Sequence, residues 1–157
     1  MSELRTTTVM DKNRILIDLS ESDRTKIGKE DFATQSVAQK VFSCVWLLEA
    51  EVNNGGFSQY FLNSSAETAS FMVSALDTIG AFRAADICKR AFGCAFPGGL
   101  PADPEAIADA AVDFSEEVLT GLEELDAEFF SYPDNLTDLL FAYVAQHPEE
   151  FGSLPEN

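Results

Sequence analysis

Hydrophobic residues recur at intervals of three and four along most of the chain, which is the spacing of amphipathic α-helices. Residues 32–53 carry the widest apolar face, because Phe42 and Trp46 add to a stripe that already has helical spacing. We therefore predict a central, mostly buried helix in this segment. It should end at the Asn-Asn-Gly-Gly run over residues 53–56, since Asn and Gly readily adopt the left-handed conformation that closes a helix. A short helix follows over residues 57–63.

The same spacing predicts further helices downstream. We expect one from residue 64 to 80, one from 81 to about 92, and three more that start near residues 103, 115 and 135. The helix that starts near residue 115 has the cleanest core stripe. This stripe consists of Val118, Leu122, Leu125, Phe129 and Tyr132.

The first thirty residues give a weaker pattern. Hydrophobic residues alternate over residues 15–19 as in a short strand, but a single strand without a partner cannot form a sheet. We expect this segment to be irregular or a short helix. The predicted fold is all-α, with one compact multi-helix domain of about six to seven helices over residues 31–151. The N-terminal segment 1–30 precedes it, and a tail over residues 152–157 follows.

The negative charge of the chain is concentrated in its C-terminal part. Residues 91–157 hold 15 Asp and Glu and no Lys or Arg, whereas residues 1–90 hold 12 acidic and 10 basic side chains. The formal net charge is −17 at pH 7. Such a surface repels the phosphates of nucleic acids and of anionic membranes, which disfavours direct binding to either. A basic protein is the partner that this charge predicts.

The acidic residues of this part follow the surface of the predicted helices. Glu105, Asp109 and Asp113 lie one turn apart, at steps of about 6 Å. Two more rows flank the core stripe of the next helix, and interleaved rows approach the one charge per roughly 3.4 Å of a DNA strand. A solvated helix face is the ordinary explanation of such runs, but that face usually mixes Glu with Lys. The residues expected to bind a partner are Asp103, Glu105, Asp109, Asp113, Glu116, Glu117, Glu123, Glu124 and Glu128.

Motifs for chemistry are lacking. Cys44, Cys88 and Cys94 show no C-x-x-C spacing, and we interpret them as apolar side chains on helices. His147 has no Ser or Cys placed near it by sequence, and we interpret it as a helix cap. The glycine pairs lack the motifs of nucleotide-binding loops, and no EF-hand order is present. We therefore expect no enzyme, and no catalytic, cofactor-binding or metal-binding residues.

The chain also lacks the features of a membrane or secreted protein. No stretch approaches the roughly 18 uninterrupted apolar residues of a membrane-spanning helix. The first residues have no apolar core of a secretory signal. The expected location is cytoplasmic.

Residues 48–63, LEAEVNNGGFSQYFLN, closely match the pattern E-V-N-N-G-G-F-x-Q-Y-F-x-N. This pattern resembles the signature of a bacterial family named after a DNA-mimic protein, and the resemblance extends over about residues 30–151. It implies an all-helical, acidic protein that occupies the nucleic-acid-binding face of a transcription factor with carboxylates in place of phosphates. The signature residues of this chain are Glu51, Asn53, Asn54, Gly55, Gly56, Phe57, Gln59, Tyr60 and Asn63.

The leading hypothesis is an interaction module that mimics the DNA phosphate backbone and occupies the basic surface of a DNA-binding protein. That partner is a regulator, a nucleoid protein or a nuclease. Because Gly and Asn dominate the signature, we interpret it as a structural turn. One alternative is a small-ligand or metal-binding protein, or an enzyme, that uses the turn over residues 53–63. Another is an acidic domain whose charge serves solubility, and a homodimer stays open.

Overall fold

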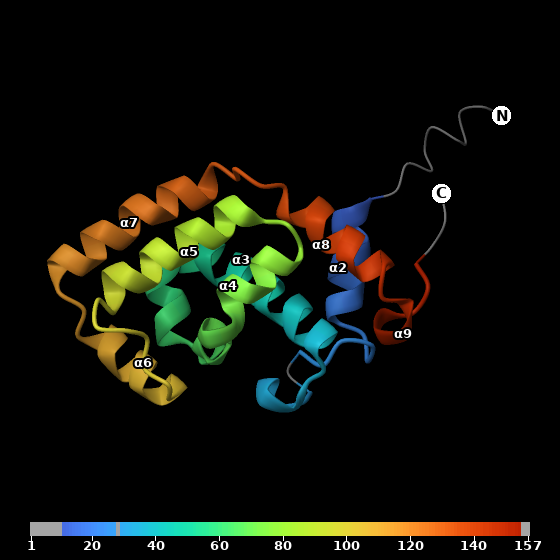
Figure 1. The fold of residues 1–157 in the computed structure, drawn as a ribbon, viewed down its shortest axis with the longest axis horizontal. Helices are drawn as coiled ribbons and strands as arrows, with labels where there is room; N and C mark the ends of the chain where they lie inside the picture. Colours follow the sequence, from blue (N-terminus) through green and yellow to red (C-terminus); the bar gives the residue numbers. More distant parts are fainter. Residues whose placement is uncertain (1–10, 28, 155–157) are drawn as a thin grey trace.

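The computed structural model describes residues 11–27 and 29–154 (Figure 1). These residues form helices, turns and loops and contain no strand, which confirms the predicted all-α fold. The expectations for residues 1–10 and 155–157 lie outside the described residues. The elements in chain order are α2 (Lys12–Ser20), η1 (Phe32–Thr34), α3 (Val37–Leu62), η2 (Ser64–Thr68), α4 (Ala69–Thr78), α5 (Phe82–Ala95), α6 (Pro104–Val112), α7 (Glu116–Phe130), α8 (Leu136–Ala145) and α9 (Pro148–Phe151).

Helix α3 forms the centre of the core, as its wide apolar face predicts. Phe42, Leu48 and Tyr60 are completely buried along it, and α4, α6, α7 and α8 pack against it. The predicted break is confirmed as a kink, because Gly55 and Gly56 have non-helical backbone angles. Gly56 has φ +79°, a left-handed conformation that favours glycine. The two segments of α3 therefore meet at this kink without an intervening loop.

Three helices in the C-terminal part begin at the residues that the sequence predicts. Asp103 caps α6 by accepting from the backbone N–H two residues later, at 2.9 Å. Ser115 caps α7 and Asn135 caps α8, each by accepting from the N–H three residues later, at 3.1 and 3.0 Å. These bonds satisfy amides that have no partner within their own helix.

Two predicted features of the core are wrong. Tyr132 does not continue the core stripe, because α7 ends at Phe130 and Tyr132 has φ +49°, which turns its side chain to 40% exposure. The helix expected from residue 64 begins only at Ala69, after the short 3₁₀ helix η2. Thr68 is completely buried and its hydroxyl pairs with that of Tyr60 at 2.5 Å, so η2 is held against α3.

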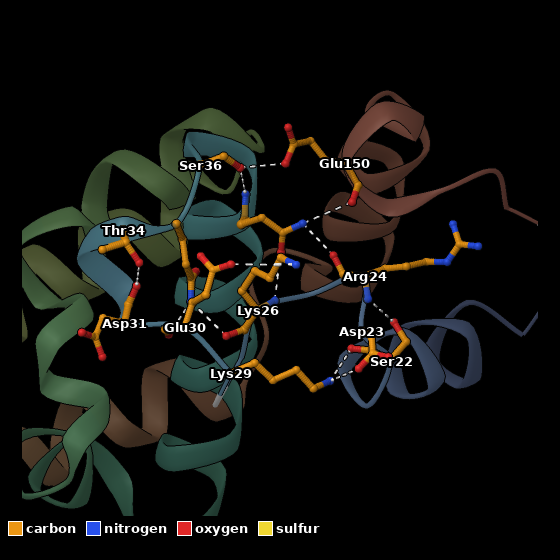
Figure 2. Close-up of polar contacts among 12 residues, drawn as sticks. Ser22, Asp23, Arg24, Lys26, Lys29, Glu30, Asp31, Thr34, Ser36 and Glu150 are labelled. Carbon is orange, nitrogen blue, oxygen red and sulfur yellow. Dashed lines mark hydrogen bonds and ion pairs between the residues drawn. The ribbon is translucent and has the colours of Figure 1, made fainter.

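In the N-terminal segment, residues Lys12–Ser20 form the short helix α2, and the alternation over residues 15–19 does not produce a strand. Leu16 and Leu19 of α2 are buried, and α2 packs against α8. Figure 2 shows how the loop after α2 is held in place. The side-chain amide of Gln39 donates to the carbonyl oxygens of Arg24 at 2.7 Å and of Glu150 at 3.2 Å. The α2 segment is thus attached to both α3 and α9.

Among the described residues, no helix has the length and hydrophobicity that crossing a membrane requires.

Candidate functional site

Helices α6 and α7 carry the predicted partner-binding residues on the surface. All nine side chains, from Asp103 to Glu128, are exposed. Figure 1 places α6 and the start of α7 together at one end of the molecule, away from α2, α8 and α9. Lys12 and Arg14 belong to α2, so these cations lie at the opposite end. The cations of α2 are therefore distant from the predicted acidic residues, whereas Arg90 belongs to α5, which packs against α7.

The acidic rows depend on where each helix begins and ends. On α7, Glu117 and Glu124 lie two turns apart within one uninterrupted helix, at a rise of about 10 Å. On α6, Glu105 and Asp109 share a face. Asp113, however, follows the last residue of α6, so the turn to α7 determines its position.

Helix electrostatics explains some of these carboxylates but not all of them. Glu105 and Glu116 lie in the first turns of α6 and α7, where the helix dipole favours negative charge. Asp113 lies at the C-terminal end of α6, where the dipole disfavours a carboxylate. Glu123 and Glu124 lie in the middle of α7, where no terminal effect stabilises them. Helix stability therefore gives no reason for these three.

Glu128 differs from the other predicted residues because it forms an ion pair. Arg90 of α5 donates to both of its carboxylate oxygens, at 2.8 and 2.7 Å, and also to Asp86 at 2.9 Å. The guanidinium lowers the pKa of Glu128. None of the other eight predicted residues forms an ion pair with another described residue. We call these eight residues the unpaired acidic face. It extends from Asp103 on α6 to Glu124 on α7 and excludes Glu128.

The signature kink in α3 is fixed by a carboxylate of α7. The backbone N–H of Phe57 donates to Asp126 Oδ1 at 2.8 Å, which caps the second segment of α3. A Cβ at Gly56 would overlap Asp126 Oδ2 and lie 2.9 Å from its Cγ. Partial burial raises the pKa of Asp126, while the Phe57 N–H opposes this shift. The Gly-Gly pair thus lets α7 lie directly against the kink.

Three polar residues of the signature bond to one another across the kink. Glu51 Oε1 accepts from the side-chain amides of Gln59 and Asn63, each at 2.7 Å. Glu51 precedes the kink and the two amides follow it, so these bonds connect the two segments of α3. These contacts favour the structural interpretation of the turn over a binding site within it.

A second set of hydrogen bonds joins α3 to the end of α7. The side-chain amide of Asn53 donates to the hydroxyl of Tyr132 at 2.8 Å, and this hydroxyl donates to Glu49 Oε2 at 2.9 Å. Burial raises the pKa of Glu49, and the Tyr132 bond opposes that shift. The positive φ of Tyr132 aims its side chain toward α3 in this arrangement.

Sequence reasoning missed Asp126, Arg90, Glu49 and Tyr132 as contributors to this region. For Asp126 a signal was present, because it lies four residues after Leu122 and three before Phe129, both of which are core positions. A carboxylate beside the core stripe needs a donor from another element. For the other three, the partner lies at least 38 residues away in the chain, and local spacing gives no indication of it.

The remaining chemistry-bearing residues have structural roles. Cys44 and Cys88 are completely buried, and burial raises the pKa of both thiols. Nδ1 of His147 lies 2.7 Å from the carbonyl oxygen of Tyr143 at the end of α8, in agreement with the predicted cap. Within the described residues, no group of three His, Cys, Asp or Glu side chains is arranged to hold a metal ion.

Comparison with protein families gives a match over most of the chain. Residues 33–147 match the model of the DMP19-like protein family. Comparisons with curated proteins and with solved structures give no match. The matched range contains the signature, the kink and the unpaired acidic face, but not α2. The DMP19-like family is not a known family of enzymes, and the match is consistent with a DNA-mimic protein. The chain belongs to the DMP19-like protein family.

Proposed function

We propose that this protein binds a basic DNA-binding protein through the unpaired acidic face of α6 and α7 and thereby keeps that protein from DNA. The partner belongs to one of three classes: regulators, nucleoid proteins or nucleases. The observation that carries the proposal is a set of eight exposed carboxylates, none of them in an ion pair with a described residue. Residues 91–157 contain no Lys or Arg that could neutralise them.

The placement of the carboxylates argues against a purely structural origin of the charge. Glu123 and Glu124 gain nothing from a helix terminus, and Asp113 lies at the unfavourable end of α6. Like charges one turn apart, as Glu105 and Asp109 are on α6, cost a few tenths of a kcal/mol per pair in an isolated helix. A basic partner surface would offset this cost, because each carboxylate would then face a Lys or Arg that otherwise binds a phosphate.

Exposed side chains on the same face give the surface some apolar character. Leu119 is 37% exposed and Phe130 is 49% exposed, and they lie one turn before and two turns after Glu123. Protein interfaces commonly combine apolar contacts with charged residues at their rim. This mixture suits a protein partner better than a cloud of small cations.

The experiment is affinity capture followed by measurement with purified partners. The immobilised chain is exposed to host lysate at low salt, and the captured DNA-binding proteins are purified. Their dissociation constants are then measured for the wild type and for a triple variant, Glu117→Gln, Glu123→Gln and Glu124→Gln. Each exposed charge pair contributes about 0.2–1 kcal/mol, so the variant should bind about threefold to a hundredfold more weakly.

A matched control separates position from net charge. Glu21→Gln, Asp77→Asn and Glu149→Gln remove three exposed carboxylates from other elements. This control should bind the partner with nearly wild-type affinity at moderate salt, because charges beyond a Debye length of about 8–10 Å are screened. If both triple variants lose the same affinity, or if capture yields no DNA-binding protein, the proposal is wrong.

A further inference from the structure

A shallow pocket lies between α2 and α3, apart from the unpaired acidic face. Its volume is about 240 Å³. One wall comes from Asn13 and Ile17 of α2. The other comes from one face of α3, where the lining residues are Trp46, Glu49, Ala50 and Asn53. Since α2 precedes the family match at residue 33, one wall of this pocket is contributed by a segment outside the family model.

Glu49 is the unusual group in this pocket. Its side chain is partly buried, and none of the described basic residues forms an ion pair with it. Glu49 accepts a hydrogen bond from the hydroxyl of Tyr132, which itself accepts from Asn53. The Tyr132 hydroxyl donates to the carboxylate and accepts from the Asn53 amide, so this short chain of donors ends on Glu49 and favours its ionised form. A partly buried carboxylate without a cation retains part of its desolvation cost.

The other lining groups suit a planar organic cation. Trp46 is partly exposed, and the face of an indole ring attracts cations more strongly than that of other aromatic side chains. Asn13 and Asn53 are exposed polar residues on the two walls and carry amide oxygens that can accept hydrogen bonds. A guanidinium group can stack on an aromatic ring while its N–H groups donate to a carboxylate.

We propose that this pocket binds an alkyl guanidinium group, which pairs with Glu49 and stacks on Trp46. Such a group is found in free small molecules and in the arginine side chain of a protein. The loop bonds through Gln39 hold α2 in place, so the pocket is largely formed before the ligand arrives. The site is separate from the proposed partner surface, and its test does not require that partner.

Trp46 makes the test direct, because it is the single tryptophan of the chain. Ethylguanidinium chloride is titrated into the full chain while the fluorescence of Trp46 is recorded, and ethylurea serves as the neutral isostere. We expect a saturable change with ethylguanidinium and none with ethylurea. Glu49→Gln should weaken binding by about tenfold or more, since it removes a charge-assisted bond. Asp77→Asn, the matched control on α4, should leave binding unchanged.

Two further arms keep the result interpretable. Ala50→Leu fills the pocket from an exposed helix position without changing charge, and it should abolish binding even if Glu49→Gln alters folding. A blocked Gly-Arg-Gly peptide distinguishes the two sources of the group. Binding as tight as that of ethylguanidinium indicates a protein side chain, and loss of binding indicates a free small molecule. Equal responses to ethylguanidinium and ethylurea, or unchanged binding in both pocket variants, would overturn the proposal.

Discussion

Replacing Gly56 by alanine tests the contact that joins the kink in α3 to α7. Gly56 has φ +79° and ψ −178°, a conformation found almost only in glycine, and forcing alanine into it costs about 1–3 kcal/mol. The new Cβ would also overlap the Asp126 carboxylate and displace it from the Phe57 N–H. Loss of a hydrogen bond to a charged group costs about 1.5–3 kcal/mol. We therefore expect Gly56→Ala to lower the free energy of unfolding by roughly 2.5–6 kcal/mol in total.

Urea denaturation followed by circular dichroism measures this change. For a chain of this size, each kcal/mol shifts the melting temperature by about 2–4 °C, so thermal unfolding should show a shift of roughly 5–24 °C. Gly93→Ala is the matched control, because nothing lies within 4 Å of its added Cβ on α5. This control should stabilise the protein by about 0.5–1 kcal/mol, the usual gain for a helix interior.

A double-mutant cycle tests the cause of the effect. In an Asp126→Ala background the overlap with the carboxylate is absent, so Gly56→Ala should cost only the backbone strain of about 1–3 kcal/mol. If Gly56→Ala changes stability by less than about 1 kcal/mol, the reasoning about the backbone is refuted. If its cost is the same with and without Asp126, the reasoning about the α7 contact is refuted.

Three other predictions concern charge and helix packing. Burial raises the folded-state pKa of Glu49 above its ordinary value of 4.5, so the wild type should lose stability relative to Glu49→Gln as the pH rises from 4.5 through that pKa. Chemical denaturation over this pH range measures the difference, and parallel profiles would contradict the assignment. Arg90→Gln frees the carboxylate of Glu128, so it should tighten binding to the proposed partner with little change in the melting temperature. An unchanged dissociation constant would argue against an acidic face that extends to Glu128. Gly121→Ala places a Cβ 2.7 Å from Cys94 Sγ and should destabilise the protein by about 1–3 kcal/mol, and Cys94→Ala should restore most of this loss in the same melting experiment.

The parts of the fold that depend on neighbouring residues in sequence could be predicted. Ser115 and Asp103 begin their helices as expected, because a capping residue acts on amides only two or three positions away. The break at Gly55 and Gly56 follows equally from local backbone preference. Tyr132 was assigned to the core wrongly, because the hydrophobic spacing of the sequence continues beyond Phe130, whereas the helix ends at that residue.

The contacts that shape the candidate site are between distant residues and could not be predicted in this way. The Arg90–Glu128 pair joins α5 to α7, and it removes one residue from the predicted acidic surface. Asp126 was one carboxylate among many in the sequence, yet its contact with the Phe57 N–H holds the signature kink. The exposure of the other acidic residues was predictable, because they lie off the apolar stripes of α6 and α7 and these helices contain no Lys or Arg.

Competition with DNA tests the central proposal most directly. The apparent dissociation constant between this protein and a captured DNA-binding partner is measured at increasing concentrations of the duplex that this partner binds. If the unpaired acidic face occupies the DNA-binding surface, the apparent constant should rise in proportion to the free duplex concentration, with no ternary complex. A dissociation constant that stays the same at saturating duplex, with all three components in one complex, would contradict the proposed mimicry.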